Sequence, residues 1–163
     1  MKKDRAGDLA QLVAEFVCSS QRPEGATLDR VKIVFADTLS ATVAGATSDV
    51  LSPLKAYILE QSSSDKVVLG TNLKTTAELS ALLNGTMAAA LEFDDVLSLM
   101  PAHPSAVVLS ALIANNTALN SSGAEVLEAY AVGVEAGARI AQAITLDHYK
   151  RGFHANHPGQ NTC

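Results

Sequence analysis

Residues 121–145 read SSGAEVLEAYAVGVEAGARIAQAIT, and this stretch decides the fold class. Ser122 and Glu125 have the spacing of a capping box, which predicts the start of a helix. An apolar residue recurs every three or four positions after them, as on one face of an amphipathic helix. The members of that face are Val126, Leu127, Tyr130, Val134 and Ala138. The stretch therefore predicts one long helix that ends near Thr145.

Small residues in this helix indicate how it packs. Gly133 and Gly137 lie four positions apart with Ala136 nearby, so a neighbouring helix can approach closely at that face. Glu125, Glu128, Glu135 and Arg139 keep the helix out of lipid. We therefore expect packing against other helices.

Two helices are predicted before residue 50. The first ends near Ser19, and the second runs from an N-cap at Thr27 to Gly45. Apolar residues at helical spacing predict a buried stripe on each. These residues are Leu9, Leu12, Val13, Phe16 and Val17 in the first helix, and Leu28, Val31, Val34, Phe35 and Leu39 in the second.

Three more helices are predicted between residues 52 and 119. Ser52 followed by Pro53 predicts a helix to about Gln61. Thr75 and Glu78 predict a capping box for a helix that ends near Asp94 and Asp95. Pro104 suits the first position of the next helix, which carries Val107, Val108, Leu112 and Ile113 inside. The run 67–70 is too short and isolated to imply a sheet. The fold class is therefore all-α, with about six helices and little or no sheet.

Composition narrows the function classes. A chain of 163 residues that is 48% hydrophobic and 18% charged is expected to form one globular domain. Its formal charge of −5 gives no basic surface for nucleic acid or for an anionic membrane. Cys18 and Cys163 have no metal-ligand spacing and form no disulfide framework. Without a visible signal peptide, a cytoplasmic protein is expected, or a mitochondrial one in a eukaryote.

Three segments carry candidate chemistry. Asp94 and Asp95 stand at a predicted helix end, where one carboxylate can face a cleft while the other is solvated. His103 lies just before a helix and is a candidate general acid or base near neutral pH. Both have a plain alternative. Asp94 and Asp95 could be a solvated acidic pair, and His103 could be an ordinary surface histidine.

The third segment is the basic stretch 150–154, which is KRGFH. Its cations could receive a carboxylate, although a polar tail is the alternative. His154 and His157 lie three apart, but a pair without a third ligand does not predict a metal site.

Several short segments, taken together, resemble the MmgE/PrpD family over roughly residues 5–155. They are Asn84-Gly85-Thr86, the run ALEFDD at 90–95, His103-Pro104-Ser105, Gly133-Val134-Glu135, Ala138-Arg139-Ile140 and the run RGFHA at 151–155. The family includes 2-methylcitrate dehydratase, cis-aconitate decarboxylase and iminodisuccinate epimerase. The resemblance implies an all-helical domain followed by a smaller α/β domain, usually in homodimers, with no metal or organic cofactor.

The resemblance also implies an active site that acts on small polycarboxylic acids. It assigns catalytic roles to Asp94, His103 and His154. Asp95, Ser105, Lys150 and Arg151 are expected to bind substrate. The expected chemistry is acid–base elimination, by dehydration or by decarboxylation. Epimerase or isomerase chemistry of the same family is one alternative, and a non-catalytic helical interaction module is another.

Two features depart from the family pattern. Ala89 stands where family members commonly have a histidine, and an alanine cannot transfer a proton. The match is expected to stop after Ala155, which gives a helical domain at 1–155 and an unrelated tail at 156–163. With the second domain missing, this truncated chain is expected to be inactive, and its exposed apolar helix faces are expected to favour association.

Overall fold

The computed structural model describes residues 5–20, 22–59, 64–97, 102–144 and 150–151. His154, His157, Cys163 and the tail at 156–163 lie outside these residues, as does the predicted domain boundary at 155. Within the described residues there are six α-helices and one two-stranded antiparallel ribbon. The all-α prediction is therefore confirmed.

The helices are α1 (Arg5–Ser19), α2 (Gly25–Gly45), α3 (Ser52–Leu59), α4 (Ala77–Ala89), α5 (Pro104–Leu119) and α6 (Gly123–Ile144). A 3-10 helix, η1 (Asp49–Leu51), precedes α3. Strands β1 (Lys66–Val67) and β2 (Lys74–Thr75) pair with Lys66 opposite Thr75. None of the described helices is long and apolar enough to cross a membrane.

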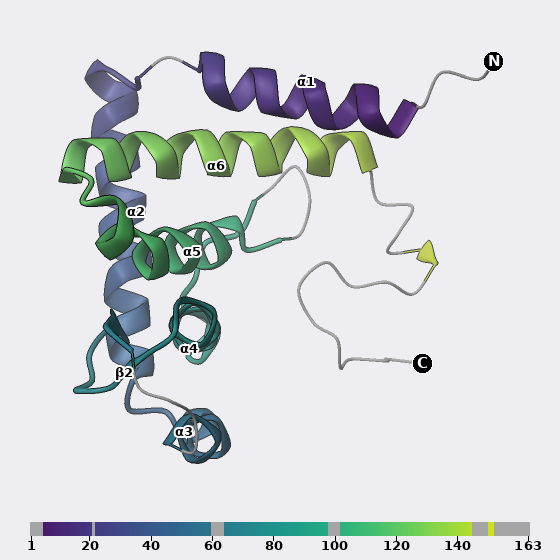
Figure 1. Cartoon of the computed structure of the whole chain (residues 1–163). Helices are drawn as coiled ribbons and strands as arrows, with labels where there is room; N and C mark the ends of the chain where they lie inside the picture. The colour runs from purple at the N-terminus through teal and green to yellow at the C-terminus, as the bar shows by residue number, and fades with distance from the viewer. Residues whose placement is uncertain (1–4, 21, 60–63, 98–101, 145–149, 152–163) are drawn as a thin grey trace.

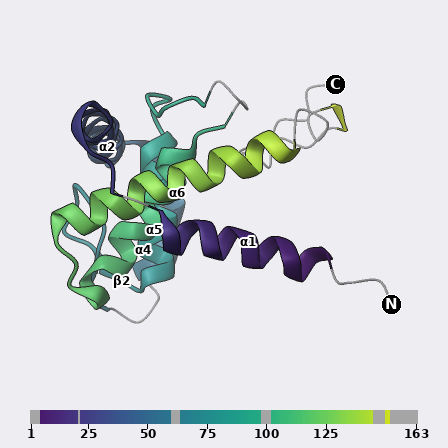
Figure 2. The same cartoon turned by 90° about the horizontal axis from the view of Figure 1, so that it is seen from above.

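The helices stack in layers along α2. Helix α4 packs against α5, α2 crosses both, and α6 covers α5 on the side away from α4 (Figure 1). The view from above shows α1 and α6 reaching together beyond the other helices (Figure 2). A buried apolar cluster lies where α4 meets η1, α3 and the β1 loop. It consists of Ala46, Leu51, Ile58, Val68, Leu83 and Met87.

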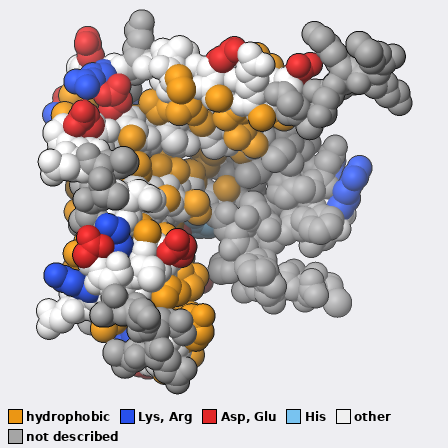
Figure 3. Space-filling model, viewed as in Figure 1, with side chains coloured by type: hydrophobic (Ala, Val, Ile, Leu, Met, Phe, Trp, Pro, Cys, Tyr) orange, Lys and Arg blue, Asp and Glu red, His pale blue; other side chains and the backbone are white. Residues whose placement is uncertain are grey.

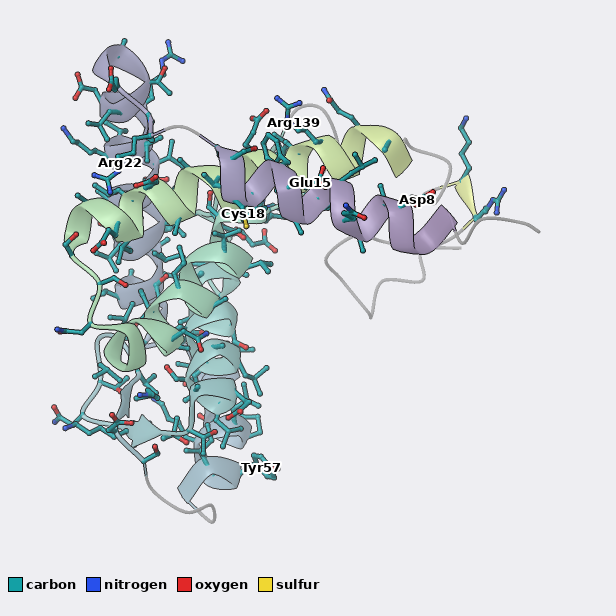
Figure 4. All side chains as sticks on the ribbon, turned by 45° about the horizontal axis from the view of Figure 1, so that its top comes forward. Asp8, Glu15, Cys18, Arg22, Tyr57 and Arg139 are labelled. Carbon is teal, nitrogen blue, oxygen red and sulfur yellow. The ribbon has the colours of Figure 1, made fainter. Side chains whose placement is uncertain are left out.

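Helix α1 is held mainly along one side of α6. Arg139 of α6 stacks over the Phe16 ring at 4.8 Å, and Figure 4 shows Arg139 beside α1. Leu9, Leu12 and Val17 are 63%, 61% and 45% exposed, so the predicted buried stripe of this helix is wrong at these three positions. The reason is that α1 packs mainly against α6, and an apolar periodicity does not say how many neighbours a helix has.

The buried face of α2 is polar and small rather than aliphatic. Thr38, Ala41, Thr42 and Gly45 are its buried residues, whereas Val34, predicted to be inside, is 36% exposed. The Thr42 hydroxyl donates to the Thr38 carbonyl at 2.7 Å, so burying it leaves no unpaired group. Small side chains let the helix axes approach, and this requirement overrides the aliphatic pattern. Val107 of α5, also predicted to be inside, is 65% exposed, so this part of the prediction is wrong.

Helix boundaries follow the predictions except at particular caps. The end of α1 at Ser19 and the start of α5 at Pro104 are confirmed. Thr76 rather than Thr75 caps α4, because its Oγ1 accepts the Leu79 N–H while Thr75 is buried in β2. Helix α2 begins at Gly25, two residues before the predicted cap. Ser48 caps η1, so that Ser52 already lies inside the helical segment.

The predicted capping box of α6 is confirmed. The Ser122 N–H and hydroxyl donate to Glu125 Oε2 at 2.8 and 2.7 Å, and the Glu125 N–H donates back to Ser122 Oγ at 3.3 Å. Hydrogen bonding, first from the Ser122 side chain and then from its backbone, lowers the pKa of Glu125 below its ordinary value of 4.5.

This cap predicts a pH effect. A carboxyl whose pKa is lowered by folding contributes stability above its unfolded pKa and loses it as pH falls through the folded value. Acidification below about pH 4.5 should therefore destabilise the wild type more than Glu125→Gln, as measured by urea unfolding at neutral and acidic pH. Glu24→Gln is the control, because Glu24 caps α2 without a side-chain hydrogen bond. Equal acid sensitivity of wild type and Glu125→Gln would contradict the prediction.

Candidate active site

The segment after α4 brings the acidic pair to the start of α5. Helix α4 ends at Ala89, so the prediction that it continues to Asp94 and Asp95 is wrong. Glu92 adopts a left-handed backbone with φ 56°, which turns the chain out of the helix. The Leu97 N–H donates to the Ala102 carbonyl at 2.9 Å and closes the far side of the segment. The two aspartates are therefore placed by a turn and not by the end of a helix.

Asp94 and His103 lie against one another. His103 Nδ1 is 3.3 Å from Asp94 Oδ2, which is close enough for an ion pair but without the geometry of a hydrogen bond. The Asp94 side chain is 5% exposed and the His103 side chain 32%. Catalytic hydrogen bonds are often long until substrate binds, so this geometry is compatible with a working pair. The ring reaches solvent while its carboxylate partner lies behind it.

Asp95 points to a different partner, the first turn of α5. Its Oδ1 accepts the Ser105 N–H at 3.2 Å and its Oδ2 accepts the Ser105 hydroxyl at 2.7 Å. A carboxylate at a helix N-terminus is favoured by the helix dipole and by the N–H groups exposed there. The Ser105 side chain is fully buried. Both residues are thus engaged with each other, and their predicted contact with substrate remains a prediction.

Tyr130 of α6 completes this buried network. Its hydroxyl donates to Ser105 Oγ at 2.6 Å, and only 2% of the residue is exposed. Burial raises the pKa of Tyr130, and hydrogen bonds with Ser105 and Thr38 partly oppose that effect. The sequence pattern identified Tyr130 only as part of an apolar face. The hydroxyl of a buried tyrosine usually has a hydrogen-bond partner. That general rule is the signal that could have indicated a polar contact for Tyr130.

The basic segment is only partly described. Lys150 and Arg151 are exposed and lie beyond the C-terminal end of α6, and His154 falls outside the described residues (Figure 1). Their predicted roles therefore remain predictions. Among the described residues, no three His, Cys, Asp or Glu side chains gather as a metal site would require.

A separate apolar groove of about 540 Å³ lies between α1, α2 and α6. Phe16, Val31, Val34 and Val134 line it, with Arg30 and Glu135 as charged members of its lining. Figure 3 shows hydrophobic side chains exposed on the face of the molecule that Figure 1 presents. Asp94 and His103 are not among the lining residues, so this groove is distinct from the Asp94–His103 pair.

These features define an all-α domain that presents a histidine–aspartate pair where one helix begins. The family model for the MmgE/PrpD N-terminal domain matches residues 7–158, and the chain belongs to this family. The chain is also 34% identical over 96 residues to the cis-aconitate decarboxylase-like protein oryM of Aspergillus oryzae. That similarity covers 54% of this chain but only 20% of the Aspergillus protein, so the chain spans about a fifth of that relative.

Proposed function

We propose that this chain supplies the acid–base side of an active site for lyase chemistry on small polycarboxylic acids. The main support is the 3.3 Å contact between His103 Nδ1 and Asp94 Oδ2. A carboxylate behind an imidazole holds the ring in one orientation. Nε2, the other ring nitrogen, is then the candidate for proton transfer with substrate.

Two eliminations suit such a pair. In a dehydration, a base removes a proton from the carbon beside a carboxylate, a double bond forms, and the hydroxyl leaves as water after gaining a proton. In a decarboxylation, the bond to the carboxylate carbon breaks, carbon dioxide leaves, and the remaining carbon takes a proton from an acid. Both develop negative charge that nearby cations stabilise. His103 is the proposed proton carrier, with His154 as a second one and Lys150 and Arg151 as the clamp for substrate carboxylates.

The Aspergillus relative's description as cis-aconitate decarboxylase-like makes decarboxylation of a tricarboxylate the first choice, ahead of dehydration of 2-methylcitrate. The match spans a fifth of that relative, and we propose that the 163-residue chain alone turns substrate over very slowly or not at all. A non-catalytic interaction module is the second candidate. Ala89, in place of the usual histidine, and Phe93, 70% exposed beside the acidic pair, favour it.

Ligand binding tests the proposal without requiring turnover. Titration of cis-aconitate or 2-methylcitrate into ¹⁵N-labelled chain should move the amide signals of Asp94, Asp95, His103 and Ser105. His103→Gln should weaken that binding about tenfold, since loss of one charge-assisted hydrogen bond is worth about 1.4 kcal/mol or more. Asp49→Asn, at an exposed position in η1, is the surface control and should bind normally.

Three results would count against this proposal. Acetate at the same concentration should leave these signals in place, and identical responses to acetate and tricarboxylates would remove the claim of substrate class. Binding unaffected by His103→Gln would locate the ligand elsewhere. Rapid product formation by the 163-residue chain would contradict the proposed incompleteness of its site, and chiral analysis of that product would distinguish elimination from epimerisation.

A further inference from the structure

We propose that Tyr130 is a positioning residue for the Asp94–His103 pair, acting through Ser105 and Asp95. The inference rests on the proposed function of that pair, but the contacts that carry it are those of the buried network. Tyr130 belongs to α6, Ser105 to α5, and Asp95 to the segment after α4. One line of hydrogen bonds therefore connects three parts of the fold that are separate in sequence.

The Asp95–Ser105 contact fixes the two backbone segments that hold the pair. Asp95 follows Asp94 directly, and Ser105 lies two residues after His103. Two hydrogen bonds, of 3.2 and 2.7 Å, join the Asp95 carboxylate to the Ser105 N–H and hydroxyl. Because each partner is adjacent or nearly adjacent to a member of the pair, these bonds set how closely Asp94 and His103 can approach.

Tyr130 fixes the Ser105 hydroxyl from the other side. The phenol donates to Ser105 Oγ at 2.6 Å, and the Ser105 hydroxyl donates onward to Asp95 Oδ2. Hydrogen bonds that run in one direction toward a charge polarise and strengthen one another. The raised pKa of Tyr130 keeps the phenol protonated, and therefore able to donate, through the neutral pH range.

The Tyr130 ring is itself immobilised by packing. Phe35 of α2 meets it edge to face, with ring centroids 5.2 Å apart. Removing the phenol hydroxyl would leave Ser105 Oγ, fully buried, with one hydrogen bond fewer. Rotation of that serine would loosen its hold on Asp95 and so change the contact between Asp94 and His103. The ring packing would remain in Tyr130→Phe, so the hydroxyl can be tested alone.

The test is the ¹⁵N signal of His103 Nδ1 at one fixed pH, assigned by its loss in His103→Gln. Tyr130→Phe should displace this signal in the same direction as Asp94→Asn, the reference for a broken pair. Ser105→Ala removes the same link and should displace it likewise, which covers the case in which Tyr130→Phe fails to fold. Phe35→Leu is the control, since it should lower the unfolding temperature and leave the Nδ1 signal in place.

An undisplaced Nδ1 signal in folded Tyr130→Phe would overturn the proposal, as would an equal displacement in Phe35→Leu, because either result would reduce Tyr130 to a packing residue. This readout needs no ligand and no turnover. A displaced signal therefore supports the positioning role even if tricarboxylates fail to bind, and that failure would count against the proposed function alone.

Discussion

Gly45→Ala is expected to destabilise this fold severely. A Cβ at Gly45 would lie 2.0 Å from the Met87 carbonyl oxygen and 2.8 Å from its carbonyl carbon. These atoms belong to the backbone of α4, so no side-chain rotation can relieve the overlap. Helices α2 and α4 would have to separate at a point where Met87 and Ala88 are fully buried.

The expected loss is about 3 kcal/mol or more, at or above the upper end for overpacked cores. Domains of this size are stable by about 5–15 kcal/mol in total, so the variant should unfold at markedly lower urea concentration. Gly137→Ala is the matched control, because nothing lies within 4 Å of a Cβ there. That variant should gain about 0.5–1 kcal/mol from helix propensity. Equal unfolding midpoints for Gly45→Ala and wild type would refute the close helix crossing.

The contrast between these glycines shows which parts of the fold the sequence could predict. Periodicity and capping signals predicted the six helices, and the Ser122–Glu125 box predicted the start of α6 because its contacts are local. Gly133 and Gly137 form an equivalent pair by spacing, yet only Gly133 lies against a neighbour, with a Cβ position 2.8 Å from Val108 Cγ1. Which small residue meets another helix depends on tertiary geometry, and a single helix contains no information about it.

Sequence also predicted only part of the candidate site, namely which residues belong to it but not how they contact one another. The segment 94–105 was identified by residue type, and the structure places Asp94 against His103. The division of labour between the two aspartates was not predictable. It depends on the left-handed turn at Glu92, which ends α4 early and directs Asp95 to Ser105 instead of solvent. The role of Tyr130 depends on how α6 packs against α5, which no local pattern contains.

Asn84 shows that a family motif can have a structural rather than a chemical role. Its side chain is fully buried in α4 and joins the helix to the β1 loop. Oδ1 accepts the Leu69 N–H at 2.9 Å, and Nδ2 donates to the Val67 carbonyl at 3.3 Å and to Ser80 Oγ at 3.2 Å. The Ser80 hydroxyl donates to the same Val67 carbonyl at 2.8 Å. This amide therefore satisfies backbone hydrogen-bonding groups at Val67 and Leu69.

Asn84→Ala is accordingly expected to cost about 3 kcal/mol, from the unpaired Leu69 N–H and from the cavity that truncation leaves. Urea unfolding measures the loss, and faster hydrogen exchange at the Leu69 amide would assign it to this contact. Asn115→Ala is the matched control, because Asn115 is exposed in α5 and donates to the Ala111 carbonyl within its own helix. That variant should change stability by no more than about 0.5 kcal/mol. Similar losses in the two variants, or unchanged exchange at Leu69, would show that Asn84 does not hold the β1 loop to α4.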